Sequence, residues 1–223
     1  MFPDLIEQLH VREQQGLKRH RTVTAGPQSV RVVIDNRAYL SFCSNDYLGL
    51  AGHPELVQAA CEGARLYGVG AGASHLINGH SAAHHALEQV LANFTGFPAA
   101  LLFSTGYMAN MGVITALVGR NDAIFADKLN HASLNEAALL SRARLIRYPH
   151  CDTAALEQRL AASTCKRKLI VTDAVFSMDG DIAVINRLIE LCEQYDAMLL
   201  IDDAHGFGVL GDKGRGVLFS PAG

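Results

Sequence analysis

The chain has 223 residues, of which 49% are hydrophobic and 18% charged, and its 19 basic and 22 acidic side chains give a net charge of −3. These values are typical of a globular protein and exclude a general electrostatic attraction to nucleic acid. No apolar run approaches the ~20 residues that span a bilayer, and the first residues, MFPD, lack the basic and apolar parts of a signal sequence. We therefore expect a cytoplasmic protein without a nucleic-acid or membrane partner.

Residues 1–43 are predicted to form an N-terminal arm, in which a polar, basic segment at 14–27 precedes a short strand pair at 31–34 and 39–42. From residue 44 to residue 223, helix-like and strand-like periodicities alternate. The expected helices cover residues 54–67, 81–96, 107–118, 132–140, 153–161 and 185–195, and the expected strands cover residues 101–103, 123–126, 144–148, 169–172 and 198–201. This order predicts an α/β domain with a mostly parallel sheet flanked by helices.

The last predicted strand ends in a carboxylate. The apolar run at 198–201 is followed by Asp202, and His205 comes three residues later, before glycines at 206, 208 and 211. Ligands of open α/β sheets bind outside the carboxyl ends of the strands, so both side chains are expected to face a bound molecule.

A strand-to-helix junction lies at residues 103–107, with the sequence FSTGY. The free N–H groups of a helix start can bind an anion such as phosphate. Ser and Thr are also favoured as ordinary N-caps without any ligand. The junction alone supports both interpretations equally.

The histidines and cysteines do not predict a metal site. His80, His84 and His85 lie close together in the sequence, but no carboxylate or thiol nearby completes a ligand set. The five cysteines are odd in number and form no C-x-x-C pair, which argues against a disulfide framework or a zinc site. His131 follows another predicted strand and is expected on the same sheet edge as Asp202.

Six motifs in a fixed order resemble the α-oxoamine synthase family, whose members are pyridoxal 5′-phosphate (PLP) enzymes of the aspartate aminotransferase fold, type I. The motifs are SNDYLGL at 44–50, the Gly-rich loop at 68–79 with SHLI, STGY at 104–107, LNHAS at 129–133, VFSMDG at 175–180 and DDAHG at 202–206. The resemblance covers nearly all 223 residues. It implies that residues 44–223 are a PLP-binding large domain, and that this domain is incomplete.

The resemblance implies cofactor-binding roles for six residues, which are Gly106, Tyr107, His131, Ser177, Asp202 and His205. Asp202 would pair with the pyridine nitrogen and keep it protonated, so that the ring acts as an electron sink. His205 would bind the phenolic oxygen, and His131 would stack on the ring. Substrate contacts are implied for Arg19, Asn45 and His131.

Within the family, SHLINGHS at 74–81 and HHALE at 84–88 most resemble the members that make 8-amino-7-oxononanoate for biotin biosynthesis. That resemblance implies an acyltransferase that condenses L-alanine with a pimeloyl thioester, either pimeloyl-CoA or pimeloyl-acyl carrier protein, with loss of CO2. Enzymes of this fold form their active sites at a dimer interface, so a homodimer is expected.

The resemblance also requires a lysine that holds the cofactor as a Schiff base and carries a proton. The family places it in a Ser- and Thr-rich turn beyond Gly223, followed by a C-terminal small domain. The five lysines of the sequence lie at 18, 128, 166, 168 and 213, and none has that context; Lys213 is expected in an exposed turn. We therefore expect no catalytic residue in this chain, and no activity from the chain alone.

Two alternatives stay open. The first is a relative that uses glycine and a short acyl-CoA, such as glycine C-acetyltransferase, because acyl-chain length cannot be read from local motifs. The second is a lysine-less, non-catalytic subunit that supports a catalytic partner. The presence of Asp202, His205 and His131 argues against the second, because a pure scaffold needs none of them.

Overall fold

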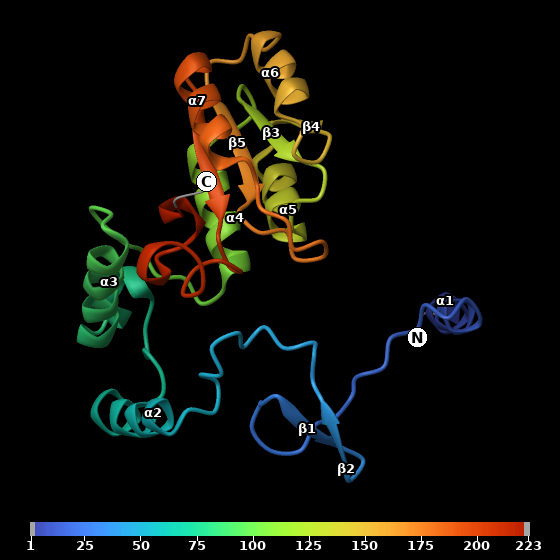
Figure 1. Cartoon of the computed structure of the whole chain (residues 1–223), viewed down its shortest axis with the longest axis vertical. Helices are drawn as coiled ribbons and strands as arrows, with labels where there is room; N and C mark the ends of the chain where they lie inside the picture. The colour runs from blue at the N-terminus through green and yellow to red at the C-terminus, as the bar shows by residue number, and fades with distance from the viewer. Residues whose placement is uncertain (1–2, 221–223) are drawn as a thin grey trace. The chain divides into compact units, whose positions relative to one another are not determined.

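The computed structural model describes residues 3–220 and divides the chain into two compact units, one up to Leu66 and one from Tyr67 onward (Figure 1). Residues 1–2 and 221–223, at the outer ends of the two predicted domains, lie outside the described residues. The predicted domain boundary between residues 43 and 44 stays a prediction.

The N-terminal unit consists of two helices and a hairpin. Helix α1 (Pro3–Gln14) was not expected, whereas α2 (Pro54–Tyr67) has the predicted bounds. Strands β1 (Arg31–Ile34) and β2 (Arg37–Leu40) pair antiparallel. The second strand begins two residues earlier than predicted, because Asp35 and Asn36 adopt positive φ angles of 48° and 60° and close a two-residue turn.

The second unit contains a four-stranded sheet in the order β4-β3-β5-β6, and every neighbouring pair is parallel. Its strands are β3 (Ala123–Asp127), β4 (Arg144–Tyr148), β5 (Lys168–Asp173) and β6 (Met198–Asp202). The predicted α/β fold with a mostly parallel sheet is therefore confirmed. The strand predicted at 101–103 is wrong, since these residues form no ladder and the Leu102 N–H donates to the Glu88 carboxylate at 3.0 Å.

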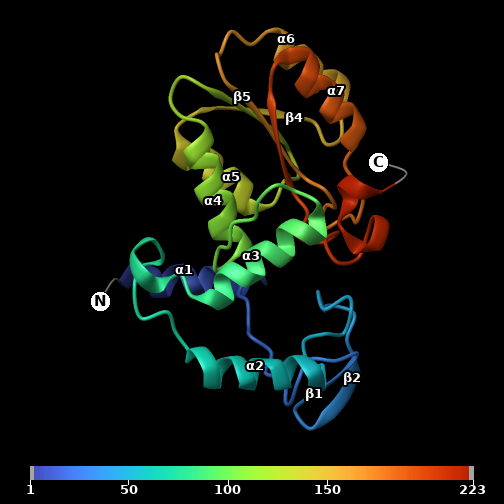
Figure 2. The ribbon, with the colours of Figure 1, turned by 90° about the vertical axis from the view of Figure 1, so that its left-hand side faces the viewer.

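Helices cover both faces of this sheet (Figure 2). Helices α4 (Gly106–Leu117) and α5 (Ala132–Ser141) pack on one face, and α6 (Thr153–Ala161) and α7 (Ile185–Tyr195) pack on the other. The core alternates along each strand, as a pleated strand requires. Ile124 and Leu169 point toward α4 and α5, whereas Phe125 and Ile170 point toward α6 and α7.

The second unit contains further helical elements besides those that cover the sheet. Helix α3 (Ala82–Thr95) starts after Ser81 and ends at Gly96, whose φ of 76° gives the left-handed C-cap expected of glycine. A single wide turn covers His75–Gly79, and short 3-10 turns cover Asp212–Gly214 and Val217–Phe219. No helix within residues 3–220 is both long and apolar enough to cross a membrane.

The α6–α7 layer is expected to carry much of the stability of the sheet domain. Leu191 of α7 is fully buried, so Leu191→Ala should lower the free energy of unfolding by about 2–5 kcal/mol through lost burial and a residual cavity. Leu139→Ala is the matched control, because Leu139 also lies in a helix but is 67% exposed. Urea unfolding followed by circular dichroism measures both. Equal losses in the two variants would contradict this account of the core.

Candidate functional site

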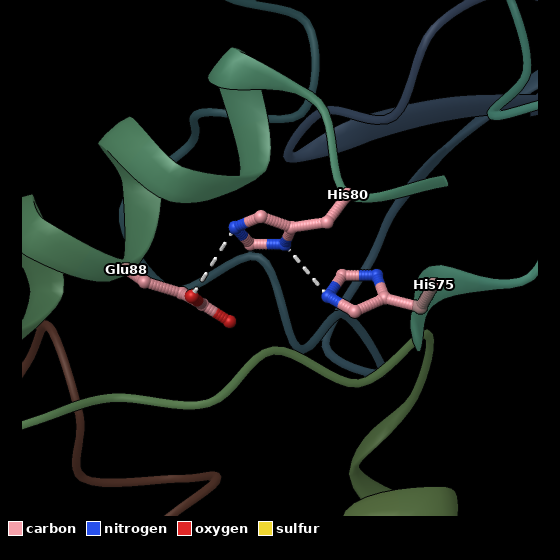
Figure 3. Close-up of side chains that lie close together, drawn as sticks. All are labelled: His75, His80 and Glu88. Carbon is pink, nitrogen blue, oxygen red and sulfur yellow. Dashed lines mark hydrogen bonds and ion pairs between the residues drawn. The ribbon is translucent and has the colours of Figure 1, made fainter. Parts of the chain in front are cut away.

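One group of side chains that could bind a metal ion lies where the loop before α3 meets that helix. His75 Nε2 lies 2.7 Å from His80 Nδ1, and His80 Nε2 lies 4.0 Å from a Glu88 carboxylate oxygen (Figure 3). The expectation that no carboxylate lies near these histidines was wrong, because the loop brings His75 and His80 together beside α3. His84 is not part of the group, since its Nδ1 accepts the Ser81 N–H at the helix start. The other Glu88 oxygen already accepts the Leu102 N–H.

A second group gathers at the carboxyl edge of the sheet. Three strands end in aspartate there, namely Asp127 on β3, Asp173 on β5 and Asp202 on β6. Asp173 and Asp202 are direct partners in the register of β5 and β6. Negative charge is therefore concentrated where the ends of open α/β sheets bind ligands.

A pocket of about 120 Å³ opens at this edge. Its lining contains all six residues predicted to bind a cofactor, together with three that were not predicted; the nine are Gly106, Tyr107, His131, Ser133, Asp173, Ser177, Asp202, Ala204 and His205. Asp173 could have been found from the sequence, because it ends an apolar strand just as Asp202 does. Ser133 carries no such signal.

The start of α4 forms one wall of the pocket. Thr105 caps the helix by accepting the Met108 N–H at 3.1 Å, so it is an ordinary N-cap. Gly106 and Tyr107, in the first turn, line the pocket, and first-turn N–H groups have no acceptor within their own helix. The two interpretations of this junction are therefore compatible, because Thr105 can cap the helix while the following N–H groups bind an anion.

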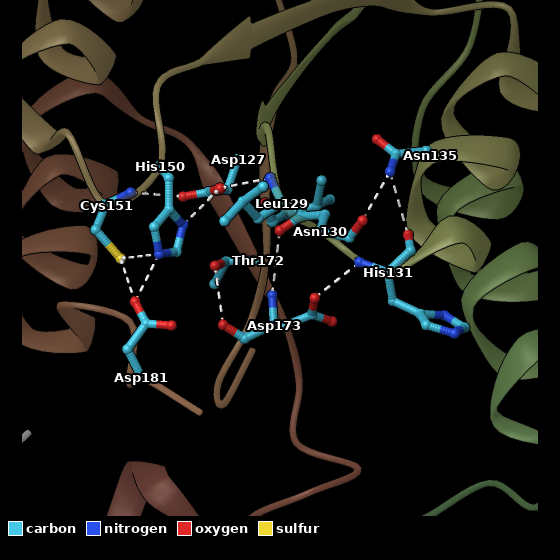
Figure 4. A network of polar contacts seen from close by, with 11 residues as sticks. Asp127, Leu129, Asn130, His131, Asn135, His150, Cys151, Thr172, Asp173 and Asp181 are labelled. Carbon is cyan, nitrogen blue, oxygen red and sulfur yellow. Dashed lines mark hydrogen bonds and ion pairs between the residues drawn. The ribbon is translucent and has the colours of Figure 1, made fainter. Parts of the chain in front are cut away.

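His131 forms the opposite wall at the start of α5. Its backbone N–H donates to Asp173 at 2.7 Å (Figure 4). Its Nδ1 accepts the Ser133 N–H at 3.2 Å. Burial raises the pKa of Asp173 to about 6; the His131 N–H opposes this shift, and the charge of Asp202 adds to it. Asn130 holds the same turn against β5, since its amide donates to Val171 O at 2.8 Å.

His150 connects the end of β3 to the loop that follows β5. His150 Nδ1 lies 3.0 Å from the buried Asp127, and its Nε2 lies 2.6 Å from Asp181 (Figure 4). Burial acts to lower the pKa of His150, but the hydrogen bonds and charges of the two carboxylates raise it above the ordinary value of 6.5. The His150 ring thus joins the end of β3 to the loop at 174–183, which also carries Ser177.

This ion-paired histidine makes the stability of the fold depend on pH. The pKa of His150 is higher in the folded than in the unfolded protein. Its contribution to the free energy of unfolding is therefore complete below about pH 6.5 and is lost as the pH rises through the folded pKa. The free energy of unfolding should fall as the pH rises above about 6.5, and His150→Gln should flatten that fall. Urea titrations at several pH values measure this, with His20→Gln at an exposed position as the control. Parallel curves for wild type and His150→Gln would rule the account out.

The predicted substrate-contacting residues lie partly outside the sheet domain. Arg19 and Asn45 belong to the N-terminal unit, where both are exposed. Their roles stay predictions, as do the cofactor roles of the six pocket residues.

The second unit carries four of the five lysines, at 128, 166, 168 and 213. Lys168 Nζ donates to Tyr195 O at 2.9 Å, and Lys213 occupies an exposed turn with a φ of 57°, as expected for that residue. Among the described residues that line the pocket there is no lysine.

Comparison with curated proteins finds similar relatives along nearly the whole chain. An 8-amino-7-oxononanoate synthase of Nitrosomonas eutropha is 66% identical over 221 residues, which are 99% of this chain and 57% of the relative. One of Nitrosospira multiformis is 67% identical, covering 96% of this chain and 54% of the relative. The chain spans a little over half the length of the curated relatives it matches.

The chain is also similar to solved structures. A serine palmitoyltransferase from S. paucimobilis with a bound PLP–myriocin aldimine has a TM-score of 0.90 and 31% identity, covering 98% of this chain and 56% of its own. An 8-amino-7-oxononanoate synthase from Francisella tularensis has a TM-score of 0.67 and 35% identity. The match covers 80% of this chain and 49% of the synthase chain.

A family model for aminotransferase class I and II matches residues 37–220, which include both the sheet and the pocket at its carboxyl edge. The chain therefore belongs to the aminotransferase class I and II family.

Proposed function

We propose that these residues form the cofactor-binding part of an 8-amino-7-oxononanoate synthase, acting as a homodimer. The reaction is the decarboxylating condensation of L-alanine with a pimeloyl thioester, on CoA or on acyl carrier protein. One observation carries the proposal: the six residues singled out by the family motifs all line a single pocket. The name carried by the most similar relatives supports the choice of substrate.

The groups that face the pocket fit PLP. A helix start with first-turn N–H groups suits its phosphate, the imidazole of His131 suits a flat ring, and the half-buried carboxylate of Asp202 suits a protonated ring nitrogen. When bound, PLP supplies an electron-accepting ring that stabilises negative charge on the α-carbon of an amino acid.

Each pocket residue then has a physical task. Gly106 and Tyr107 would bind the phosphate through the start of α4, and His131 would lie against the ring. Asp202 would pair with the ring nitrogen and favour its protonated form, since a nearby carboxylate stabilises the positive charge. His205 would bind the phenolic oxygen, and Ser177 would be a further cofactor contact.

Proton transfer at the α-carbon is a separate task. The family assigns it to a lysine, and the described pocket lining contains none. We assign to these 223 residues the binding and orientation of cofactor and amino acid. The five lysines of this sequence are not assigned this task in the proposal.

The first test is PLP binding followed by borohydride reduction and peptide mass mapping. PLP should bind with one site per chain, and reduction should label no single lysine preferentially, because the described lysines of the sheet domain lie outside the pocket lining. Asp202→Asn should weaken binding about tenfold to a hundredfold, the range for a lost hydrogen bond to a charged group. Asp196→Asn, at an exposed position, is the charge-matched control. Unchanged affinity in Asp202→Asn would refute the assigned role.

The second test concerns the amino acid. L-alanine should perturb the absorption spectrum of the bound cofactor at lower concentration than glycine does, since the proposed reaction uses alanine. D-alanine is the stereochemical control. A stronger response to glycine would instead favour a synthase related to glycine C-acetyltransferase.

A further inference from the structure

A buried chain of hydrogen bonds joins the two walls of the pocket behind its surface. The Asn110 amide nitrogen, on α4, lies 2.7 Å from Asp202 Oδ2 and 2.9 Å from Ser133 Oγ. Ser133 Oγ, on α5, lies 2.7 Å from His131 Nδ1. Asn110 is 8% exposed and Ser133 is 1% exposed, so solvent does not compete for these contacts.

One arrangement of donors and acceptors agrees with all of these contacts. The Ser133 N–H points at His131 Nδ1, so that nitrogen is an acceptor, and the Ser133 hydroxyl shares its lone pair. Ser133 Oγ therefore accepts one amide hydrogen of Asn110, and Asp202 accepts the other. Rotating the amide would place its oxygen against the Asp202 carboxylate, two acceptors in contact.

This arrangement fixes both groups that the proposed function places on the pyridine ring. The second Asp202 oxygen accepts the Ala204 N–H at 3.1 Å, so each oxygen of the carboxylate has a donor. With Nδ1 occupied, the neutral imidazole of His131 carries its proton on Nε2. Asn110 donates both to Asp202 and to Ser133, and Ser133 in turn contacts His131.

We propose that Asn110 is a positioning residue, which acts with Ser133 to couple the orientation of Asp202 to that of His131. Asn110 acts through these two side chains, and its effect on cofactor binding rests on the proposed function. Because α4 and α5 carry the two linking residues, the packing of these helices also sets the relative placement of the carboxylate and the imidazole.

The test begins without any cofactor. Nitrogen-15 NMR of the imidazoles reports which ring nitrogen carries the proton, and the His131 signals are identified by their loss in His131→Gln. In wild type the Nε2–H form should dominate at pH 8. Asn110→Leu, which is similar in volume but cannot donate, should weaken that preference, and Ser133→Ala, which loses the hydroxyl but keeps the backbone N–H, should weaken it as well. Thr115→Val, at an exposed position on the same helix, should change nothing.

Cofactor affinity is the second readout. Asn110→Leu should raise the dissociation constant of PLP about tenfold, because a buried hydrogen bond to a charged group is lost. The double variant Asn110→Leu/Asp202→Asn should bind only slightly more weakly than Asp202→Asn alone, because the two residues act through one contact. Near-ultraviolet circular dichroism checks folding, and Asn110→Ser replaces Asn110→Leu if the latter unfolds.

The two proposals fail in different ways. If wild type does not bind PLP, the proposed function is wrong, and the NMR comparison still decides whether Asn110 couples the two side chains. If wild type binds PLP but Asn110→Leu leaves both the His131 signals and the affinity unchanged, the positioning role is overturned while the proposed function stands. Additive losses in the double variant would also overturn it.

Discussion

The carboxylates at one edge of the sheet must each find hydrogen-bond donors, and this requirement determines the loops around the pocket. Asp127 is almost fully buried, and its oxygens accept N–H groups of Leu129 and Cys151 as well as the His150 ring. A buried carboxylate without such partners would cost several kcal/mol. The turns that supply these N–H groups are therefore fixed by the charge they surround.

The same requirement applies to the neighbouring strands. Asp203, next to Asp202, accepts the Val217 N–H at 2.8 Å and thereby holds the segment after β6 against the sheet, while burial raises its pKa. Asp173 accepts the His131 N–H; burial raises its pKa to about 6, and the charge of Asp202 adds to that shift. Asp173 and Asp202 both line the pocket, and two carboxylates suit a ligand with a positively charged or proton-donating group.

Part of the pocket wall could be predicted from a local rule, whereas Ser177 was predicted only through the resemblance to the family. Asp202 ends a strand and Gly106 begins a helix, and both features can be read from a few neighbouring residues. Asn110 and Ser133 could not be found in this way. Asn110 lies 92 residues from Asp202 and 23 residues from Ser133 in the sequence, so tertiary packing is needed to bring these side chains together. The strand predicted at 101–103 failed for a related reason, since a strand needs a neighbour that local sequence cannot supply.

Helix α4 contributes to the pocket at two points along its length. Gly106 lies in its first turn and Asn110 one turn later, about 6 Å along the axis at the rise of an α-helix. An α-helix stretches and compresses very little, so the separation between its first turn and the side chain that holds Asp202 is constant. The first turn of the helix and the Asp202 carboxylate are therefore held at a fixed separation, and neither can move without disturbing the other.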